Sequence, residues 1–159
     1  MKEIIKQIEN WAIEKGLHEA DSFRQFAKHV EEGAEYLLAE SNTQKILELG
    51  DNVVTLTILA LQNDIDVLNA SCRAEQFGRD TRKDISIVNG SIAEALCKKD
   101  KLSLEFSIGE FFNLIAIKSG THNSNIDECA ELAYNKIASR TGKMVDGVFV
   151  KSEDLPEGV

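Results

Sequence analysis

The chain is poor in residues that break or cross-link helices, since its 159 residues include one proline and three cysteines. So few helix-breaking residues favour a helical fold. The cysteines, Cys72, Cys97 and Cys129, are odd in number and widely spaced, which argues against a disulfide framework or a zinc knuckle. They indicate a reducing compartment, so we expect a cytoplasmic protein.

Positive charge and long hydrophobic runs are also scarce. The 18 Lys and Arg residues are outnumbered by 27 Asp and Glu residues, which gives a net charge of −9. Nucleic acids and anionic membrane surfaces would repel such a chain, so we expect neither as a partner. The longest apolar-rich run, residues 53–61, is far shorter than the roughly 20 residues that a membrane-spanning helix needs. A phosphate compound can still bind if a metal ion bridges it to the acidic protein.

Apolar residues recur at helical spacing along most of the chain, which predicts a series of helices. Gly16 ends the first helix, and Asp21 or Ser22 caps the second. The third follows a break at residues 41–43 and should be the most buried, because apolar residues surround it almost completely. The pattern predicts four later helices over about 63–77, 91–99, 103–118 and 126–140.

The other segments lack this pattern. Residues 78–89 are polar and give no clear assignment, and residues 119–125 have the composition of a loop. After Gly142 we expect an extended tail over residues 142–159, with a turn at residues 146–147 and a frayed end. The sequence thus predicts a single all-α domain over residues 1–159, an antiparallel helical bundle with an extended C-terminal tail.

Two groups of acidic residues share one helical spacing. Glu32 and Glu35 lie three residues apart on the second predicted helix, where Glu31 is also a neighbour of Glu35. Glu48 and Asp51 repeat the three-residue spacing on the third predicted helix. Because the link between these helices is short, they should be antiparallel neighbours, with the two carboxylate pairs facing each other.

Four carboxylates that meet inside a bundle would repel one another unless a cation neutralised them. An all-oxygen ligand set suits Mg²⁺, for which Mn²⁺ can substitute. The alternative is a solvated helix face with ordinary surface acids, but the second pair interrupts a strongly apolar helix, which favours the metal site. A di-iron bundle needs Glu-x-x-His pairs, and none of His18, His29 and His122 has a glutamate three residues before it.

Residues 31–35 (EEGAE) followed by residues 48–51 (ELGD) resemble the Glu-Glu-x-x-Glu … Glu-x-x-Asp signature of the MazG-like all-α nucleoside triphosphate pyrophosphohydrolases. The resemblance covers roughly residues 20–66, including the lead-in QFAK at residues 25–28, and residues 124–154. It implies a Mg²⁺-dependent hydrolysis of an NTP or dNTP between the α and β phosphates. The products would be the nucleoside monophosphate and pyrophosphate.

The resemblance also implies roles for the acidic residues. It makes Glu32, Glu35, Glu48 and Asp51 the metal ligands. Glu31 would be an extra ligand or the base that orients the attacking water, so Glu31 and Glu32 are the expected catalytic residues.

The expected substrate-binding residues are Gln25, Lys28, Asn135, Lys136 and Arg140. Lys136 and Arg140 lie one helical turn apart and could bind phosphate oxygens together, although two basic residues also stabilise the end of a helix. For Gln25 and Lys28 the alternative is ordinary helix surface. The resemblance further implies a homo-oligomer and favours a dimer.

About 60 residues separate the two parts of the resemblance, where compact MazG-like domains have a short stretch. We interpret them as a second, degenerate copy of the first motif. Residues 34–51 align with residues 93–110 without a gap, and two inserted residues would then continue the alignment. This predicts a catalytic half over residues 20–77 and a degenerate half over residues 83–141. Identities are few, so a chance match or an unrelated insertion is the alternative.

The degenerate half would lack a metal site, because Ser91 stands at the place of Glu32 and Ser107 at the place of Glu48. The chain would then be a pseudo-dimer with one working site. Two other functions also stay open: a phosphoribosyl-ATP pyrophosphohydrolase with the same chemistry, and a non-catalytic helical module that binds a nucleotide or a protein through the acidic groove.

Overall fold

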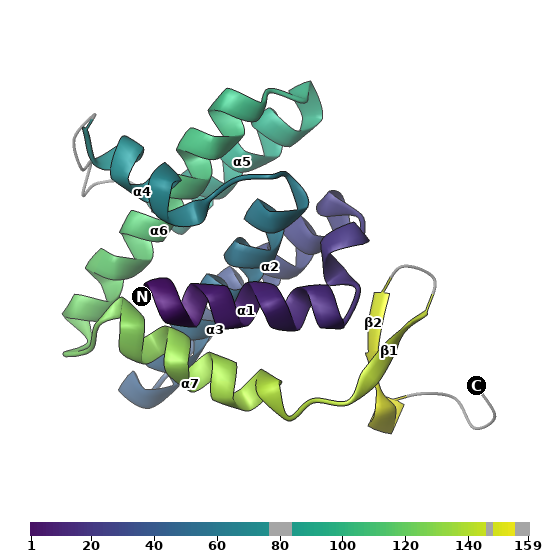
Figure 1. Ribbon diagram of the computed structural model, residues 1–159. Helices are drawn as coiled ribbons and strands as arrows, with labels where there is room; N and C mark the ends of the chain where they lie inside the picture. The colour runs from purple at the N-terminus through teal and green to yellow at the C-terminus, as the bar shows by residue number, and fades with distance from the viewer. Residues whose placement is uncertain (77–83, 146–147, 155–159) are drawn as a thin grey trace.

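The structure, a computed structural model, describes residues 1–76, 84–145 and 148–154 (Figure 1). Within these residues it is all-α apart from one hairpin, which confirms the predicted fold class. The helices are α1 (Lys2–Glu14), α2 (Ser22–Leu38), α3 (Asn42–Gln62), α4 (Val67–Gln76), α5 (Ile85–Lys98), α6 (Lys101–Thr121) and α7 (Ile126–Ala138). Short 3₁₀ helices cover Leu17–Glu19 and Ser152–Asp154. The antiparallel hairpin pairs β1 (Gly142–Val145) with β2 (Val148–Lys151).

Helix α3 is the buried centre of the bundle. Every residue from Leu49 to Ala60 is buried, as expected for a helix that is apolar on nearly all sides. Helices α1, α2, α6 and α7 all pack against it. A charged residue on α3 must therefore find an opposite charge or an ion, because its neighbours exclude water.

Polar contacts fix α2 against α3. Side-chain caps set the start of each helix, Asp21 for α2 and Ser41 for α3. Gln25 Nε2 donates a hydrogen bond to the Thr55 carbonyl oxygen (3.0 Å), and His29 Nδ1 lies 3.0 Å from Thr55 Oγ1. These contacts hold the acidic segment of α2 in register with the acidic segment of α3.

Several helix boundaries differ from the sequence prediction. Helix α5 begins at Ile85 and not near Ser91, because the Asp84 side chain caps it by accepting a hydrogen bond from the Ile85 amide. Helix α7 ends at Ala138, and Arg140 lies in the following turn, where its amide bonds the Ile137 carbonyl oxygen (2.9 Å). The predicted end of the fourth helix at Phe77 lies outside the described residues.

The predicted extended tail contains the β1–β2 hairpin, and a 3₁₀ helix over Ser152–Asp154 stands where the sequence predicted fraying. The predicted turn at residues 146–147 and the last residues, 155–159, lie outside the described residues. The hairpin rests against α1 through an edge-to-face contact between Trp11 and Phe149, whose ring centroids are 6.1 Å apart. None of the described helices is both long enough and apolar enough to cross a membrane.

Candidate metal centre

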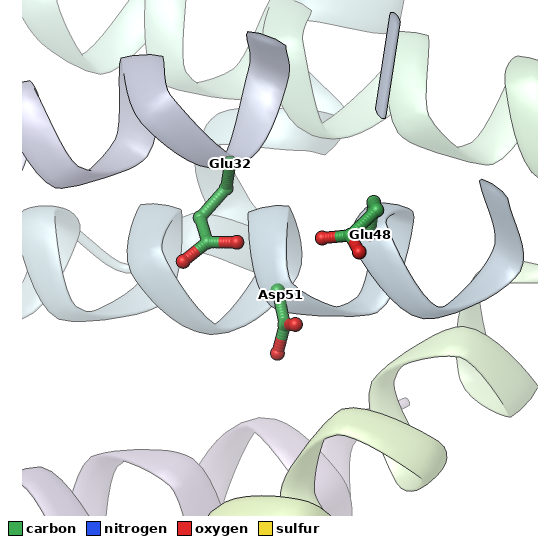
Figure 2. Close-up of side chains that lie close together, drawn as sticks. All are labelled: Glu32, Glu48 and Asp51. Atoms are coloured by element: carbon green, nitrogen blue, oxygen red, sulfur yellow. The ribbon is translucent and has the colours of Figure 1, made fainter. Parts of the chain in front are cut away.

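Glu32, Glu48 and Asp51 meet between α2 and α3, and we call these three residues the carboxylate cluster (Figure 2). Each contributes a carboxylate oxygen that lies within 4.8 Å of those of the other two. Figure 2 shows the carboxylates of Glu32 and Glu48 pointing toward each other, with that of Asp51 below them. The three-residue spacing places Glu48 and Asp51 one turn apart on α3, and the packing of α2 brings Glu32 to them.

Burial makes the carboxylate cluster costly as long as it holds only negative charge. Glu32 and Asp51 are each 7% exposed, and Glu48 Oε2 is buried without a hydrogen-bond partner among the described residues. Burial and then the neighbouring carboxylates raise the pKa of Glu48. Burial also raises the pKa of Glu32, against the opposing effect of the Lys28 ammonium. Converging carboxylate oxygens with an unused lone pair are the donor set that Mg²⁺ and Mn²⁺ prefer, so these residues fit such an ion.

Two lysines compensate part of this charge. Lys28 Nζ lies 2.8 Å from Glu32 Oε1 and 2.9 Å from Glu31 Oε2, and Lys136 Nζ of α7 lies 2.6 Å from Asp51 Oδ2. Burial opposes the charge on Lys28, but its ion pairs with Glu32 and Glu31 outweigh burial and raise its pKa. Across residues 1–76, 84–145 and 148–154, no basic side chain forms an ion pair with Glu48. The cluster therefore keeps one uncompensated carboxylate.

A cavity of about 380 Å³ opens beside the carboxylate cluster. Its acidic lining residues are Asp21, Glu32, Glu35 and Asp51. Its basic lining residues are Arg24, Lys28, Lys136 and Arg140. Its apolar wall consists of Trp11, Leu17, Ala20, Val54, Ile58, Ile137 and Phe149. One cavity thus offers oxygen ligands for a cation, donors for anionic oxygens and an apolar surface.

The structure brings most of the predicted site residues to this cavity. The lining includes Gln25, Lys28, Glu32, Glu35, Asp51, Lys136 and Arg140, and Glu48 completes the carboxylate cluster. Glu35, expected as a fourth metal ligand, is exposed and lies outside the cluster of three. Glu31 is also exposed; it contacts Lys28 but is absent from the lining of the cavity. Asn135 is exposed and is absent from the lining of the cavity.

Some lining residues were missed at the sequence level. Thr55 and Ile58 lie four and seven residues after Asp51, so helical periodicity along α3 could have identified them. Phe149 comes from the opposite end of the chain to Trp11, and no spacing rule predicts its position beside the cavity.

Comparisons with protein-family models, with curated proteins and with solved structures find no match to this chain. The geometry of the carboxylate cluster and its cavity therefore carries the functional interpretation, together with the motif resemblance.

Proposed function

We propose that the protein is a cytoplasmic, Mg²⁺-dependent nucleoside triphosphate pyrophosphohydrolase of the MazG-like type, which hydrolyses an NTP or dNTP between the α and β phosphates. The observation that carries this proposal is the carboxylate cluster, only partly compensated by two lysines, beside a cavity with four basic lining residues. A metal–triphosphate complex has matching charges, because its cation suits the cluster and its phosphate oxygens suit the lysines and arginines.

Glu32, Glu48 and Asp51 would hold the metal ion, and Glu35 on the cavity wall is the nearest candidate for a further ligand. When bound, Mg²⁺ would neutralise phosphate charge and lower the pKa of a water nucleophile. The apolar wall near Trp11 and Phe149 offers a surface for the nucleobase, and about 380 Å³ lies within the range of small-molecule pockets.

The basic side chains that line the cavity would bind the phosphates. Lys28 and Lys136 pair with Glu32 and Asp51, and both can exchange these carboxylates for phosphate oxygens once a divalent cation neutralises the cluster. Arg140 lines the same cavity and can hold the leaving pyrophosphate. Two exposed carboxylates could accept the proton of the attacking water: Glu35, which lines the cavity, and Glu31, which contacts Lys28.

A product assay tests the proposal. The protein would be incubated with Mg²⁺ and a panel of NTPs, dNTPs, modified triphosphates and phosphoribosyl-ATP, and the products separated by chromatography. We expect pyrophosphate and the corresponding monophosphate, and turnover should disappear in Glu32→Gln. Glu40→Gln is the matched control, because it removes the same charge from an exposed position outside the cavity.

Other outcomes would separate the alternatives. Turnover of phosphoribosyl-ATP and of no other compound would favour the alternative function of a phosphoribosyl-ATP pyrophosphohydrolase. Diphosphate and inorganic phosphate as products would contradict hydrolysis between the α and β phosphates. Mn²⁺ binding at the carboxylate cluster without turnover of any compound would favour a non-catalytic nucleotide-binding module.

A further inference from the structure

The geometry of the chain from α3 to the start of α4 recurs 59 residues later, from α6 to the start of α7. Helix α3 covers Asn42–Gln62 and α6 covers Lys101–Thr121, so both ends of α6 lie 59 positions after those of α3. Helix α7 begins at Ile126, 59 positions after α4 begins at Val67. The predicted two-residue insertion is therefore wrong, because the spacing continues unchanged from α3 and α6 into the following helices.

The connections between these helices agree in detail. Asp64 (φ 52°) and Asn123 (φ 56°) are two of three described non-glycine residues with a positive φ, and they are 59 positions apart. Just after each, the amide of Ile65 bonds the Ala60 carbonyl oxygen (2.9 Å), and the amide of Ser124 bonds the Ser119 carbonyl oxygen (3.1 Å). A left-handed aspartate or asparagine is uncommon enough to make this agreement informative.

The helix caps follow the same spacing. Ser41 caps α3 through the Gln44 amide, and Asp100 caps α6 through the Ser103 amide. Asp66 accepts a hydrogen bond from the Asn69 amide (2.9 Å) at the start of α4. Its counterpart Asn125 accepts one from the Glu128 amide (3.0 Å) at the start of α7.

The packing between the halves is reciprocal. A Cβ atom at Gly50 of α3 would overlap the carbonyl oxygen of Cys129 in α7, and one at Gly109 of α6 would overlap that of Ala70 in α4. Gly109 is the counterpart of Gly50, and Cys129 is the counterpart of Ala70. Each helix hairpin is thus covered by the last helix of the other half. Such exchange of equivalent contacts is the mark of two-fold symmetry.

The symmetry gives the carboxylate cluster a counterpart. A cavity of about 660 Å³ lies between α4, α5 and α6. The counterparts of Glu32, Glu35, Glu48 and Asp51 all line it, and they are Ser91, Glu94, Ser107 and Glu110.

We propose that the chain is an internal two-fold repeat and that this second cavity is a divalent-cation site that has been lost. In it, Ser91 and Ser107 occupy the positions that correspond to the carboxylate residues Glu32 and Glu48. The proposal rests on the metal centre assigned under the proposed function. A serine hydroxyl is a neutral ligand and cannot offset the charge of a bound cation as a carboxylate does. Glu94 now pairs with Lys98 in the same cavity, as Arg73 does with Glu105.

Restoring the carboxylates tests the proposal. Mn²⁺ binding to the full chain would be measured by calorimetric titration for the wild type and for Ser91→Glu/Ser107→Glu. We expect the double variant to bind one Mn²⁺ per chain more than the wild type. Ser91→Gln/Ser107→Gln is the matched control, since it adds the same volume without charge and should leave the stoichiometry unchanged.

Ser107 is 5% exposed, so circular dichroism must first show that each variant is folded. If Ser107→Glu prevents folding, the shorter Ser107→Asp replaces it in the double variant. A folded double variant with wild-type stoichiometry would overturn the lost site. A wild type without Mn²⁺ binding would instead contradict the proposed metal centre. Adding Glu48→Gln to the double variant should remove only the binding shown by the wild type.

Discussion

Glu48→Gln should stabilise the metal-free protein while it abolishes metal binding. Its carboxylate has no ion pair, and its Oε2 atom is buried without a hydrogen-bond partner among the residues described. Two unit charges 4.8 Å apart repel by about 3 kcal/mol at an effective dielectric constant of about 20. Lys28 and Lys136 offset much of this repulsion through Glu32 and Asp51. A net stabilisation of about 1–2 kcal/mol remains for the neutral amide.

Differential scanning calorimetry at pH 7 without metal would measure the effect. At about 2–4 °C per kcal/mol for a chain of this size, the Tm of Glu48→Gln should exceed that of the wild type by about 2–8 °C. A metal concentration 100 times the Kd stabilises a folded protein by about 2.7 kcal/mol, so excess Mg²⁺ should reverse the order of the two Tm values.

The Tm difference between Glu48→Gln and the wild type should depend on pH in one direction only. Because the pKa of Glu48 is raised in the folded state, its destabilising effect is absent at low pH and develops as the pH rises through the raised value. The Tm advantage of Glu48→Gln should therefore vanish in acid. A variant that is less stable than the wild type without metal, and that keeps the full Mg²⁺-induced shift in Tm, would refute this account of Glu48. Glu40→Gln, on the exposed surface, should change neither quantity.

Three further predictions concern other parts of the fold. Lys136→Met should lower kcat/KM by about a hundredfold, because it removes a phosphate donor from the cavity; steady-state kinetics would check this. Gly50→Ala should destabilise the protein by at least about 3 kcal/mol through overlap with α7, whereas Gly90→Ala, with open space around it, should stabilise α5 by about 0.5–1 kcal/mol in denaturant unfolding. Burial lowers the pKa of His29 from 6.5 to about 3, so the unfolded chain takes up a proton in this pH range that the folded protein does not. Acidification from pH 6.5 to about 3 should therefore lower the free energy of unfolding by about 5 kcal/mol through this residue, and His29→Gln should lose this pH dependence.

The carboxylate cluster was predictable because it depends on local rules. Glu48 and Asp51 lie on one side of α3 because of helical spacing. The short link between α2 and α3 makes the two helices antiparallel neighbours, which places Glu32 opposite them. The ion pair between Lys136 and Asp51 joins residues 85 positions apart and depends on how α7 packs, so its geometry needed the structure. The position of Phe149 beside the cavity depends likewise on tertiary packing.

The start of α5 shows where the periodicity rule failed. Ile85, Val88 and Ile92 are buried at helical spacing, but Asn89 and Gly90 between them have low helix propensity and made the segment look irregular. Burial of the apolar side chains Ile85, Val88 and Ile92 in the bundle outweighs that local preference.

Hydrolysis in water enriched in heavy oxygen tests the central claim most directly. The protein would turn over its best triphosphate substrate with Mg²⁺, and mass spectrometry would locate the label in the products. Attack at the α phosphorus predicts one labelled oxygen in the nucleoside monophosphate and none in pyrophosphate. Label in inorganic phosphate, or the same turnover by Glu32→Gln, would contradict a pyrophosphohydrolase that works through the carboxylate cluster.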